Sequence, residues 1–397
     1  MNKKLGLAVA GALVAFASTA NAGITIPAGD WTVDIGGNVN AYYTNVDSKT
    51  TDTAGVTTSG ANANTIGTGL LPAAFGIGAK TRQNDLDIAF QFSFFTGTSS
   101  GNNAIAGGAA GNNTLNIRQA FVTFGDASWG TIKAGRDLGI FGSDAILSDM
   151  TLLGVGVSGA GVTSAGGSST LGRIGSGYIY ADWKGQMSYT SPNWNGFQFA
   201  AGVMENFTPM TTTVAGFTPS YTKDNMAFEG KVTYDFAAND VTGRVWLGGI
   251  TQKTEGVTYD GNYTSRGVDV GAKLAYQGFG LVGYYYDGRG LDGQLFLGGL
   301  FNATGLKTDD NGGYVQATFV VPGIGTKLGA SYGTSKSKYD IAKIENESYI
   351  LGAYHPLTKS LNLVAEYTNQ EITANVNGVG NAKLESDTVS LGAIMFF

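Results

Sequence analysis

Side chains near the end of the chain alternate in a way that few folds can accommodate. Between 388 and 397, apolar residues take every second position, from Val389 through Leu391 and Met395 to Phe397. A period of two is the repeat of a β-strand, so one face of this strand is apolar along its length. In water such a face would promote aggregation, whereas the outer wall of a closed β-barrel in a lipid bilayer requires it.

The beginning of the chain has the pattern of a secretory signal peptide. Two lysines precede an apolar run over 5–16, and small residues around Ala20 and Ala22 follow it, which is the arrangement found before a cleavage site. The run is too short to cross a bilayer as a helix, so a membrane anchor is the weaker interpretation. We expect residues 1–22 to be removed on export and 23–397 to form one β-barrel domain.

The composition excludes several classes of function. Charged residues make up 14% of the chain, against about 25% in a typical soluble domain, and an apolar outer surface would explain this. The chain has no cysteine and a single histidine, His355, which rules out thiolate and histidine-cluster metal sites. A net charge of −6 gives no basic surface for nucleic acid. We therefore expect no cofactor, no metal and no nucleic-acid partner.

The alternation recurs along the chain, notably in 31–43, 85–95 and 226–236. Within 85–95, for example, phenylalanines alternate with Asp, Gln and Ser. No stretch after the leader reaches the roughly 18 consecutive apolar residues of a membrane helix, so a membrane-embedded form must be built from strands.

Two kinds of connection alternate between the expected strands. Short turn-like sequences lie at 81–84, 237–240, 277–280, 321–325 and 357–360, and long polar segments lie at about 45–69, 97–113, 206–224, 252–264, 288–311, 335–346 and 371–384. Short turns at one rim and long loops at the other are typical of outer-membrane barrels. The pattern predicts an all-β protein, a transmembrane antiparallel barrel of about 16 strands.

One connection, between Arg136 and about Trp183, is too long for an ordinary loop. Its first half contains apolar residues such as Ile140 and Phe141, and a Gly/Ser-rich run follows. The apolar content indicates packing against protein, and we expect the segment to fold into the barrel. Arg173, at the end of the Gly/Ser-rich run, is expected to be solvated.

Several stretches resemble the general trimeric porins of Gram-negative bacteria: 116–122, 130–136, 144–150, 189–197, and 351–360 together with Phe397. Their order and spacing cover essentially the whole mature chain. The resemblance implies a homotrimer in the outer membrane, in contact with outer-membrane lipid and lipopolysaccharide, through which small polar solutes and ions diffuse passively. It also implies that Phe397, Met395 and Leu391 form a membrane-insertion signal.

In that family the third loop folds into the pore and narrows it, and acidic residues on the loop face basic residues on the wall. By position, the resemblance assigns six residues to the constriction: Arg118 and Lys184 on the wall, Asp144 and Asp149 on the loop, and Arg136 with Asp137 where the loop leaves the wall.

The strand assignment of Arg118 also carries a prediction about its neighbours. Arg118 takes the pore-facing parity of its strand, so that Ile117 and Phe121 are expected to face lipid. Two structural roles stay open beside the pore roles: Arg118 could tie the loop to the wall, and Arg136 could anchor the root of the loop.

The loop carboxylates and two departures from the family pattern affect the expected selectivity. Asp144 and Asp149 could instead cap a short helical turn. Ala74 stands where a further wall arginine is expected, and 151–155 lacks an acid that is usual in the family's loop. We therefore expect a weak field across the constriction and a weakly selective pore.

Three other functions are alternatives to a general pore. A substrate-selective channel of the same fold is the main alternative, and aromatic or charged ladders along the pore would favour it. A surface adhesin or structural barrel would conduct no ions. An enzyme is not expected, because the single histidine weakens any arrangement of a nucleophile and a base, and the glycine pattern at 278–283 leads into a strand-like sequence rather than a helix.

Overall fold

The computed structural model describes residues 23–60, 62–97, 115–158, 169–206, 221–222, 224–256, 262–291, 308–340 and 342–397. The expected leader, 1–22, lies outside these ranges, as do most of the expected loops 97–113 and 206–224 and the middle parts of 252–264 and 288–311. No helix in the described ranges is long and apolar enough to cross a membrane.

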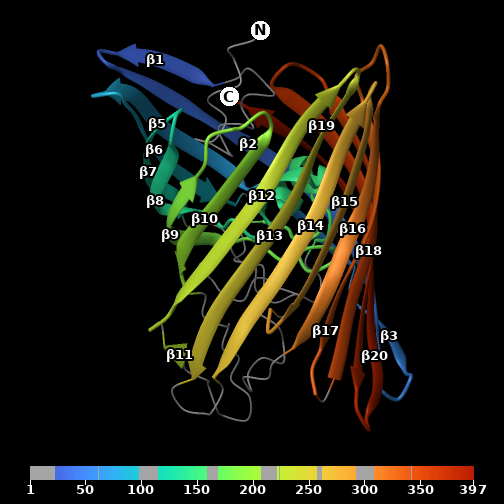
Figure 1. Ribbon diagram of the computed structural model, residues 1–397. Helices are drawn as coiled ribbons and strands as arrows, with labels where there is room; N and C mark the ends of the chain where they lie inside the picture. The colour runs from blue at the N-terminus through green and yellow to red at the C-terminus, as the bar shows by residue number, and fades with distance from the viewer. Residues whose placement is uncertain are drawn as a thin grey trace.

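Within the described residues, sixteen strands form a closed antiparallel ring (Figure 1). They are β2 (Trp31–Thr51), β5 (Ala73–Gln83), β6 (Leu86–Thr96), β7 (Asn116–Asp126), β8 (Gly130–Leu138), β9 (Trp183–Thr190), β10 (Phe197–Glu205), β12 (Met226–Ala238), β13 (Val241–Gly256), β14 (Tyr263–Tyr276), β15 (Phe279–Arg289), β16 (Asp309–Val320), β17 (Lys327–Lys338), β18 (Ala342–Pro356), β19 (Leu361–Val376) and β20 (Gly380–Phe396). Each strand pairs with the next one in this order. β20 pairs with β2 in a register that runs from Asn38 opposite Phe396 to Thr51 opposite Lys383, and this pairing closes the ring. The predicted 16-strand barrel is confirmed.

Four short strands lie outside the ring order. β1 (Ile24–Ala28) pairs with the start of β2, and β3 (Thr57–Ser59) and β4 (Ala63–Gly67) pair with its later part. β11 (Tyr221–Thr222) pairs with the end of β13. β1 and the end of β20 lie at the same end of the barrel, uppermost in Figure 1, and β3 and β11 lie at the other end.

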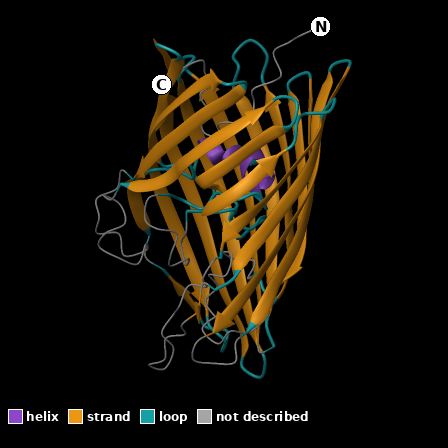
Figure 2. Ribbon diagram, turned by 60° about the vertical axis from the view of Figure 1, so that its left-hand side comes forward, coloured by secondary structure: helices purple, strands orange, loops and turns teal. Residues whose placement is uncertain are grey.

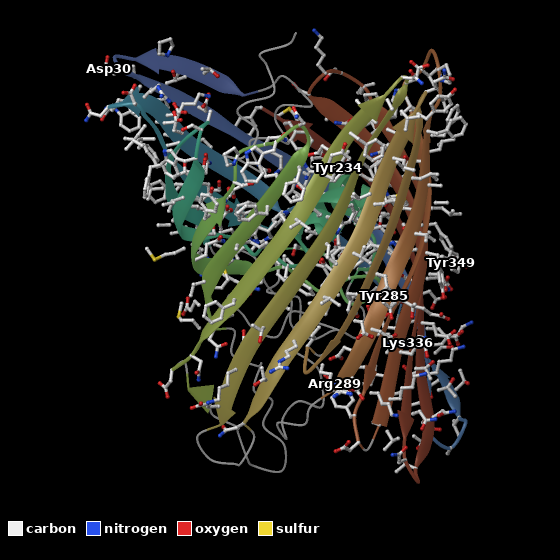
Figure 3. All side chains as sticks on the ribbon, in the orientation of Figure 1. Asp30, Tyr234, Tyr285, Arg289, Lys336 and Tyr349 are labelled. Carbon is white, nitrogen blue, oxygen red and sulfur yellow. The ribbon has the colours of Figure 1, made fainter. Side chains whose placement is uncertain are left out.

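The two faces of the barrel wall differ as the period-two pattern predicts. On β6, Phe90 and Phe92 are 36% and 43% exposed, whereas Gln91 and Ser93 are 4% and 3% exposed. On this part of β6 the aromatic side chains are therefore on the outside and the polar ones on the inside, the reverse of a water-soluble core. Figure 3 shows the same for Tyr285 and Tyr349, which project from the outer wall.

Tight connections gather at one end of the barrel, here called the turn rim. The β5–β6 turn uses Asn84 and Asp85 with φ of 48° and 64°, and the β14–β15 turn uses Gln277 and Gly278 with φ of 43° and 88°. Two consecutive residues of positive φ give the turn a backbone twist that matches the right-handed twist of the strands that it joins. All five predicted tight connections fall between paired strands at this rim. The opposite end is called the loop rim.

Two of the predicted long loops are wrong. Residues 335–346 are mostly paired strand, with Ser335 opposite Asn346 and Lys338 opposite Lys343. Residues 371–384 likewise form a hairpin that continues β19 and β20. The strands were predicted from apolar residues at every second position. These strand ends carry polar and charged residues on their outer face instead, so that pattern is missing there.

The last strand has the expected outward face. Leu391 and Met395 are exposed on the outer wall, whereas Ile394 and Phe396 are buried on the inner side. The backbone of Phe397 exchanges hydrogen bonds with Gly37, N–O distances 2.9 and 3.1 Å. The chain end is therefore paired with β2, and its role as an insertion signal stays a prediction.

The connection between β8 and β9 returns into the space enclosed by the strands. Its described residues, 139–158 and 169–182, are here called the inner segment and contain α2 (Ser143–Ser148) and the 3-10 helix η2 (Met150–Leu153). Figure 2 shows these helices within the ring of strands. Apolar residues of the inner segment pack against inward-facing aromatic residues of the wall, among them Trp246, Tyr284, Tyr286 and Tyr314.

Candidate channel constriction

A buried carboxylate of the wall holds the root of the inner segment. Glu229 on β12 accepts hydrogen bonds from the backbone N–H groups of Ile140 and Phe141, at 2.6 and 2.9 Å. Its other oxygen lies 2.5 Å from Nζ of Lys184, and both side chains are almost fully buried. Glu229 thus neutralises Lys184 and fixes the point where the segment leaves the wall.

The middle of the inner segment is bound in the same way from two further strands. The N–H of Gly142 donates to the Asp269 carboxylate on β14 at 3.0 Å. On β16, Gln316 accepts from the N–H of Met150 at 2.8 Å and donates to the carbonyl of Ser148 at 3.1 Å. These contacts hold α2 against the wall at both of its ends and η2 at its first residue.

The far side of the segment is bound by Glu366 on β19. Its Oε2 accepts from the N–H groups of Val155 and Gly156 at 2.8 and 2.7 Å, and its Oε1 accepts from the Tyr354 hydroxyl at 2.6 Å. A Cβ atom at Gly154 would lie 2.0 Å from Oε1, so only glycine allows this approach. The wall acids therefore serve chiefly as acceptors for the backbone of the inner segment.

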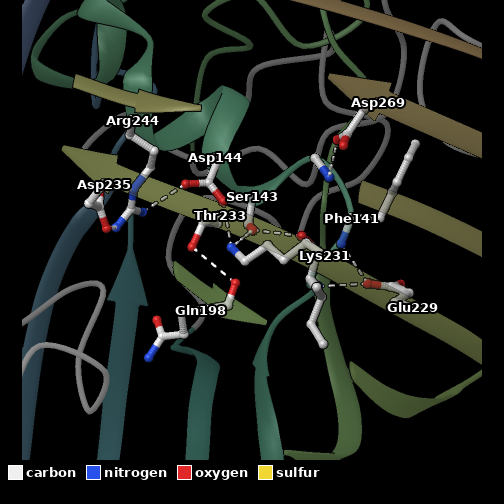
Figure 4. A network of polar contacts seen from close by, with 12 residues as sticks. Phe141, Ser143, Asp144, Gln198, Glu229, Lys231, Thr233, Asp235, Arg244 and Asp269 are labelled. Carbon is white, nitrogen blue, oxygen red and sulfur yellow. Dashed lines mark hydrogen bonds and ion pairs between the residues drawn. The ribbon is translucent and has the colours of Figure 1, made fainter. Parts of the chain in front are cut away.

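Asp144 is an acid of the inner segment that contacts wall cations directly. Its carboxylate lies 2.6 Å from Nζ of Lys231 on β12 and 3.0 Å from a guanidinium nitrogen of Arg244 on β13 (Figure 4). Arg244 also makes a bidentate pair with Asp235, at 2.6 and 2.7 Å. Burial alone would raise the pKa of Asp144, but the Lys231 and Arg244 cations outweigh it and lower that pKa.

The capping alternative applies to one of the two loop acids. Asp149 accepts from the N–H of Thr151 at 2.9 Å and so caps η2, and it also accepts from the Tyr178 hydroxyl at 2.8 Å. Asp144 caps nothing, since Gly142 is the N-cap of α2. Asp149 is thus a structural acid, whereas Asp144 forms part of the charged contact with the wall.

Arg118 lies on the inner side of the wall and Ile117 is exposed on the outer side, as expected, but the expectation for Phe121 is wrong. The register shifts between Ser93 and Phe94, which makes Arg118 an extra residue in β7. Beyond this β-bulge Phe121 is buried on the inner side and Val122 is exposed on the outer side. The guanidinium of Arg118 lies 4.9 Å from the centroid of the Phe95 ring, a buried inward-facing residue.

Arg136 and Asp137 take opposite faces of β8. Asp137 is buried, accepts from Gln119 at 2.8 Å and pairs with Lys133. Arg136 is exposed and lies on the face of β8 opposite to Asp137.

Three of the predicted cations act electrostatically on Asp182, the last residue of the inner segment. Burial raises the pKa of the Asp182 carboxyl, and the charges of Lys184, Arg136 and Arg118 oppose that rise only in part. Lys184, Arg136 and Arg118 thus all act on Asp182, whereas Asp144 contacts Lys231 and Arg244, on β12 and β13.

Arg173 is buried rather than solvated, which corrects the expectation from its Gly/Ser-rich surroundings. Its Nε donates to the Ser331 hydroxyl at 2.6 Å and NH1 donates to the Ser348 hydroxyl at 3.2 Å. It thereby joins the second half of the inner segment to β17 and β18.

The main wall partners of the inner segment were not predicted from the sequence. Glu229 and Lys231 stand on the polar parity of 226–236, and a charge on the inward parity of a membrane strand was the available signal. Arg244 and Glu366 carried the same signal and were not singled out.

A sequence model of the family described as Gram-negative porin matches residues 8–375. The chain belongs to the Gram-negative porin family. The barrel of this porin is accordingly an outer-membrane channel for the passive diffusion of solutes, and the porin family is not enzymatic. No curated protein matches this porin significantly by sequence.

Solved structures show the same fold at low sequence identity. The anion-selective porin from Comamonas acidovorans has a TM-score of 0.59 at 17% identity, covering 92% of this porin and 100% of that chain. The outer membrane channel DcaP of Acinetobacter baumannii has a TM-score of 0.64 at 16% identity, covering 95% and 100%. The trimer form of in-vitro folded OmpT from Vibrio cholerae has a TM-score of 0.56 at 14% identity, covering 92% and 99%.

Proposed function

We propose that this porin is a general diffusion channel for small hydrophilic solutes and ions, with weak selectivity, and that the inner segment forms its constriction. The observation that carries the proposal is the binding of the segment's backbone by Glu229, Asp269, Gln316 and Glu366, from four strands around the wall. A segment held in this way narrows the lumen permanently instead of moving aside. Charges of both signs, including Asp144, Lys231 and Arg244, lie at the narrowing.

The substrate-selective alternative gains no support from the inward aromatic residues. Trp246, Tyr284, Tyr286 and Tyr314 could form a ladder for a passing solute, but each is at most 6% exposed. They are covered by the inner segment and serve to anchor it. A passing solute would therefore not reach them.

The Asp144→Asn substitution tests the assignment of the constriction. It removes one negative charge and leaves Lys231 and Arg244 incompletely neutralised, so the anion-over-cation permeability ratio should rise roughly threefold. Reversal potentials across planar bilayers under a KCl gradient measure this ratio. Glu345→Gln is a matched control, because Glu345 also pairs with two cations, Lys336 and Lys343, but on the outer wall. An equal shift in both variants, or none in either, would rule out the assignment, and near-ideal selectivity of the wild type would rule out a general pore.

We further propose that the porin is a homotrimer that associates through the wall formed by β5–β8. These four strands are 9 to 11 residues long, whereas β18–β20 are 15 to 17 residues long. The short wall carries large outward side chains such as Phe75 and Phe92. A wall of short strands with an apolar outer face is suited to packing against another barrel, because strands in such a contact need not extend into solvent.

Light scattering in mild detergent should therefore give the mass of three chains for the wild type. Replacing both Phe75 and Phe92 with Gln should shift the population toward single chains, since it removes the apolar contact area of that wall. The matched substitution Phe228→Gln, on the outer face of β12, should leave the trimer intact. A wild-type mass of one chain would refute the trimer.

Export and lipid contact complete the proposal. We propose that 1–22 is a signal peptide removed on export, which the mass of the protein isolated from outer membranes would test. The outer wall would contact lipid along its apolar band. Near the loop rim, the outward charges Lys336, Lys343 and Lys383 would contact the head groups of lipopolysaccharide.

A further inference from the structure

Lys273 is a cation of the inner wall that has no acidic partner. It lies on β14 two residues from Gly271 and four from Asp269, on the same inward parity, and close to the turn rim. Its side chain is exposed, and no carboxylate in the described ranges lies within ion-pair distance of its ammonium group. The other inward lysines of β8, β9 and β12 each pair with an acid.

The register around Lys273 makes this lack of a partner more unusual. Directly opposite on β13 stands Arg244, and directly opposite on β15 stands Val282. Like charges opposite each other in an antiparallel pair destabilise a sheet. The two inward neighbours on its own strand are Gly271 and Ala275, so the adjacent inward positions of β14 supply no acid to offset the repulsion.

The nearby acids are already bound to the other cations. Asp235 makes its bidentate pair with Arg244, and Asp144 is shared between Arg244 and Lys231. Lys273 interacts electrostatically with all four of these groups. Three cations on adjacent strands thus face two carboxylates, and the unmatched positive charge is at Lys273, the exposed member.

We propose that Lys273, supported by Arg244 and Lys231, forms an anion-binding station between the constriction and the turn rim. It would hold small oxyanions, carboxylates and phosphate, weakly enough that they leave again, and would give the channel a modest preference for anions. The wall keeps the cations Lys273 and Arg244 opposite each other although they repel, and Lys273 has no acid paired with it. Such an arrangement fits a site where a ligand that passes through the channel supplies the neutralising charge. The inference rests on the proposed diffusion function of the same channel.

The test uses purified full-length protein in planar bilayers, with Lys273→Gln and, as matched control, Lys338→Gln. Lys338 is exposed on the outer wall, so its substitution changes the net charge equally without changing the lumen. Lys273→Gln should lower the anion-over-cation permeability ratio roughly threefold, and Lys338→Gln should not. Inorganic phosphate added on the turn-rim side should reduce the chloride current of the wild type and of Lys273→Arg, but not that of Lys273→Gln.

The outcomes separate the two proposals. A permeability ratio and a phosphate effect that are the same in wild type and Lys273→Gln would overturn the anion station while leaving the diffusion channel in place. Absence of any current from correctly folded wild-type protein would overturn the diffusion function and the station together.

Discussion

Replacing Glu229 with Leu should release the root of the inner segment and accelerate hydrogen exchange there by on the order of a hundredfold. The substitution leaves the N–H groups of Ile140 and Phe141 without an acceptor and leaves Lys184 buried without its counter-charge. Removing one partner of a buried ion pair costs about 3–5 kcal/mol. Exchange measured by mass spectrometry on protein in detergent micelles would report the amides of 139–142 directly.

Two variants separate the hydrogen bonds of Glu229 from its charge. Glu229→Gln keeps an acceptor for the segment but loses the counter-charge of Lys184, so its effect should lie between wild type and Glu229→Leu. Adding Lys184→Met to Glu229→Leu removes the stranded cation and should recover part of the lost protection. If Glu229→Leu exchanged no faster than wild type, the anchoring role of this carboxylate would be wrong.

Replacing Glu366 with Leu should detach the opposite side of the inner segment. Three buried donors, the N–H groups of Val155 and Gly156 and the hydroxyl of Tyr354, would lose their acceptor. Each buried donor left unsatisfied costs about 1–3 kcal/mol. We expect faster hydrogen exchange over 154–158 and frequent brief changes in single-channel current, because the segment would no longer be held at a fixed distance from β19.

The Glu366 prediction has its own control. Glu366→Gln keeps acceptor capacity at the same place and should remain close to wild type in both measurements. Exchange at 139–142 should change little, because Glu229 binds that end of the segment independently. Steady current and unchanged exchange in Glu366→Leu would show that packing alone holds the segment in place.

The barrel itself was predictable because lipid imposes one simple rule on every strand. Phe90, Phe92 and Leu391 had to face outward, and the alternation that this requires is visible in the sequence. The tight turns were predictable for a related reason, since Asn and Gly supply the positive φ that two-residue turns need. Beyond the apolar band the rule ends, and the paired segments 335–346 and 371–384 were mistaken for loops.

The site was only partly predictable because its contacts depend on register and on long-range packing. The extra residue at Arg118 reversed the facing of Phe121, and no feature of the strand sequence marks that β-bulge. The pairing of Lys184 with Glu229 joins residues 45 positions apart, and that of Asp144 with Arg244 joins residues 100 apart. The resemblance placed the individual charges at the pore, and only the fold shows which of them neutralise one another.

Swelling of liposomes that contain the purified porin tests most directly whether the barrel encloses a water-filled path narrowed by the inner segment. Liposomes loaded with an impermeant polymer are diluted into isotonic solutions of uncharged sugars of increasing size. The expected result is fast swelling with the smallest sugars and a steep fall with size, with little dependence on which sugar of a given size is used. Swelling no faster than in protein-free liposomes, even with the smallest sugar, would contradict the account.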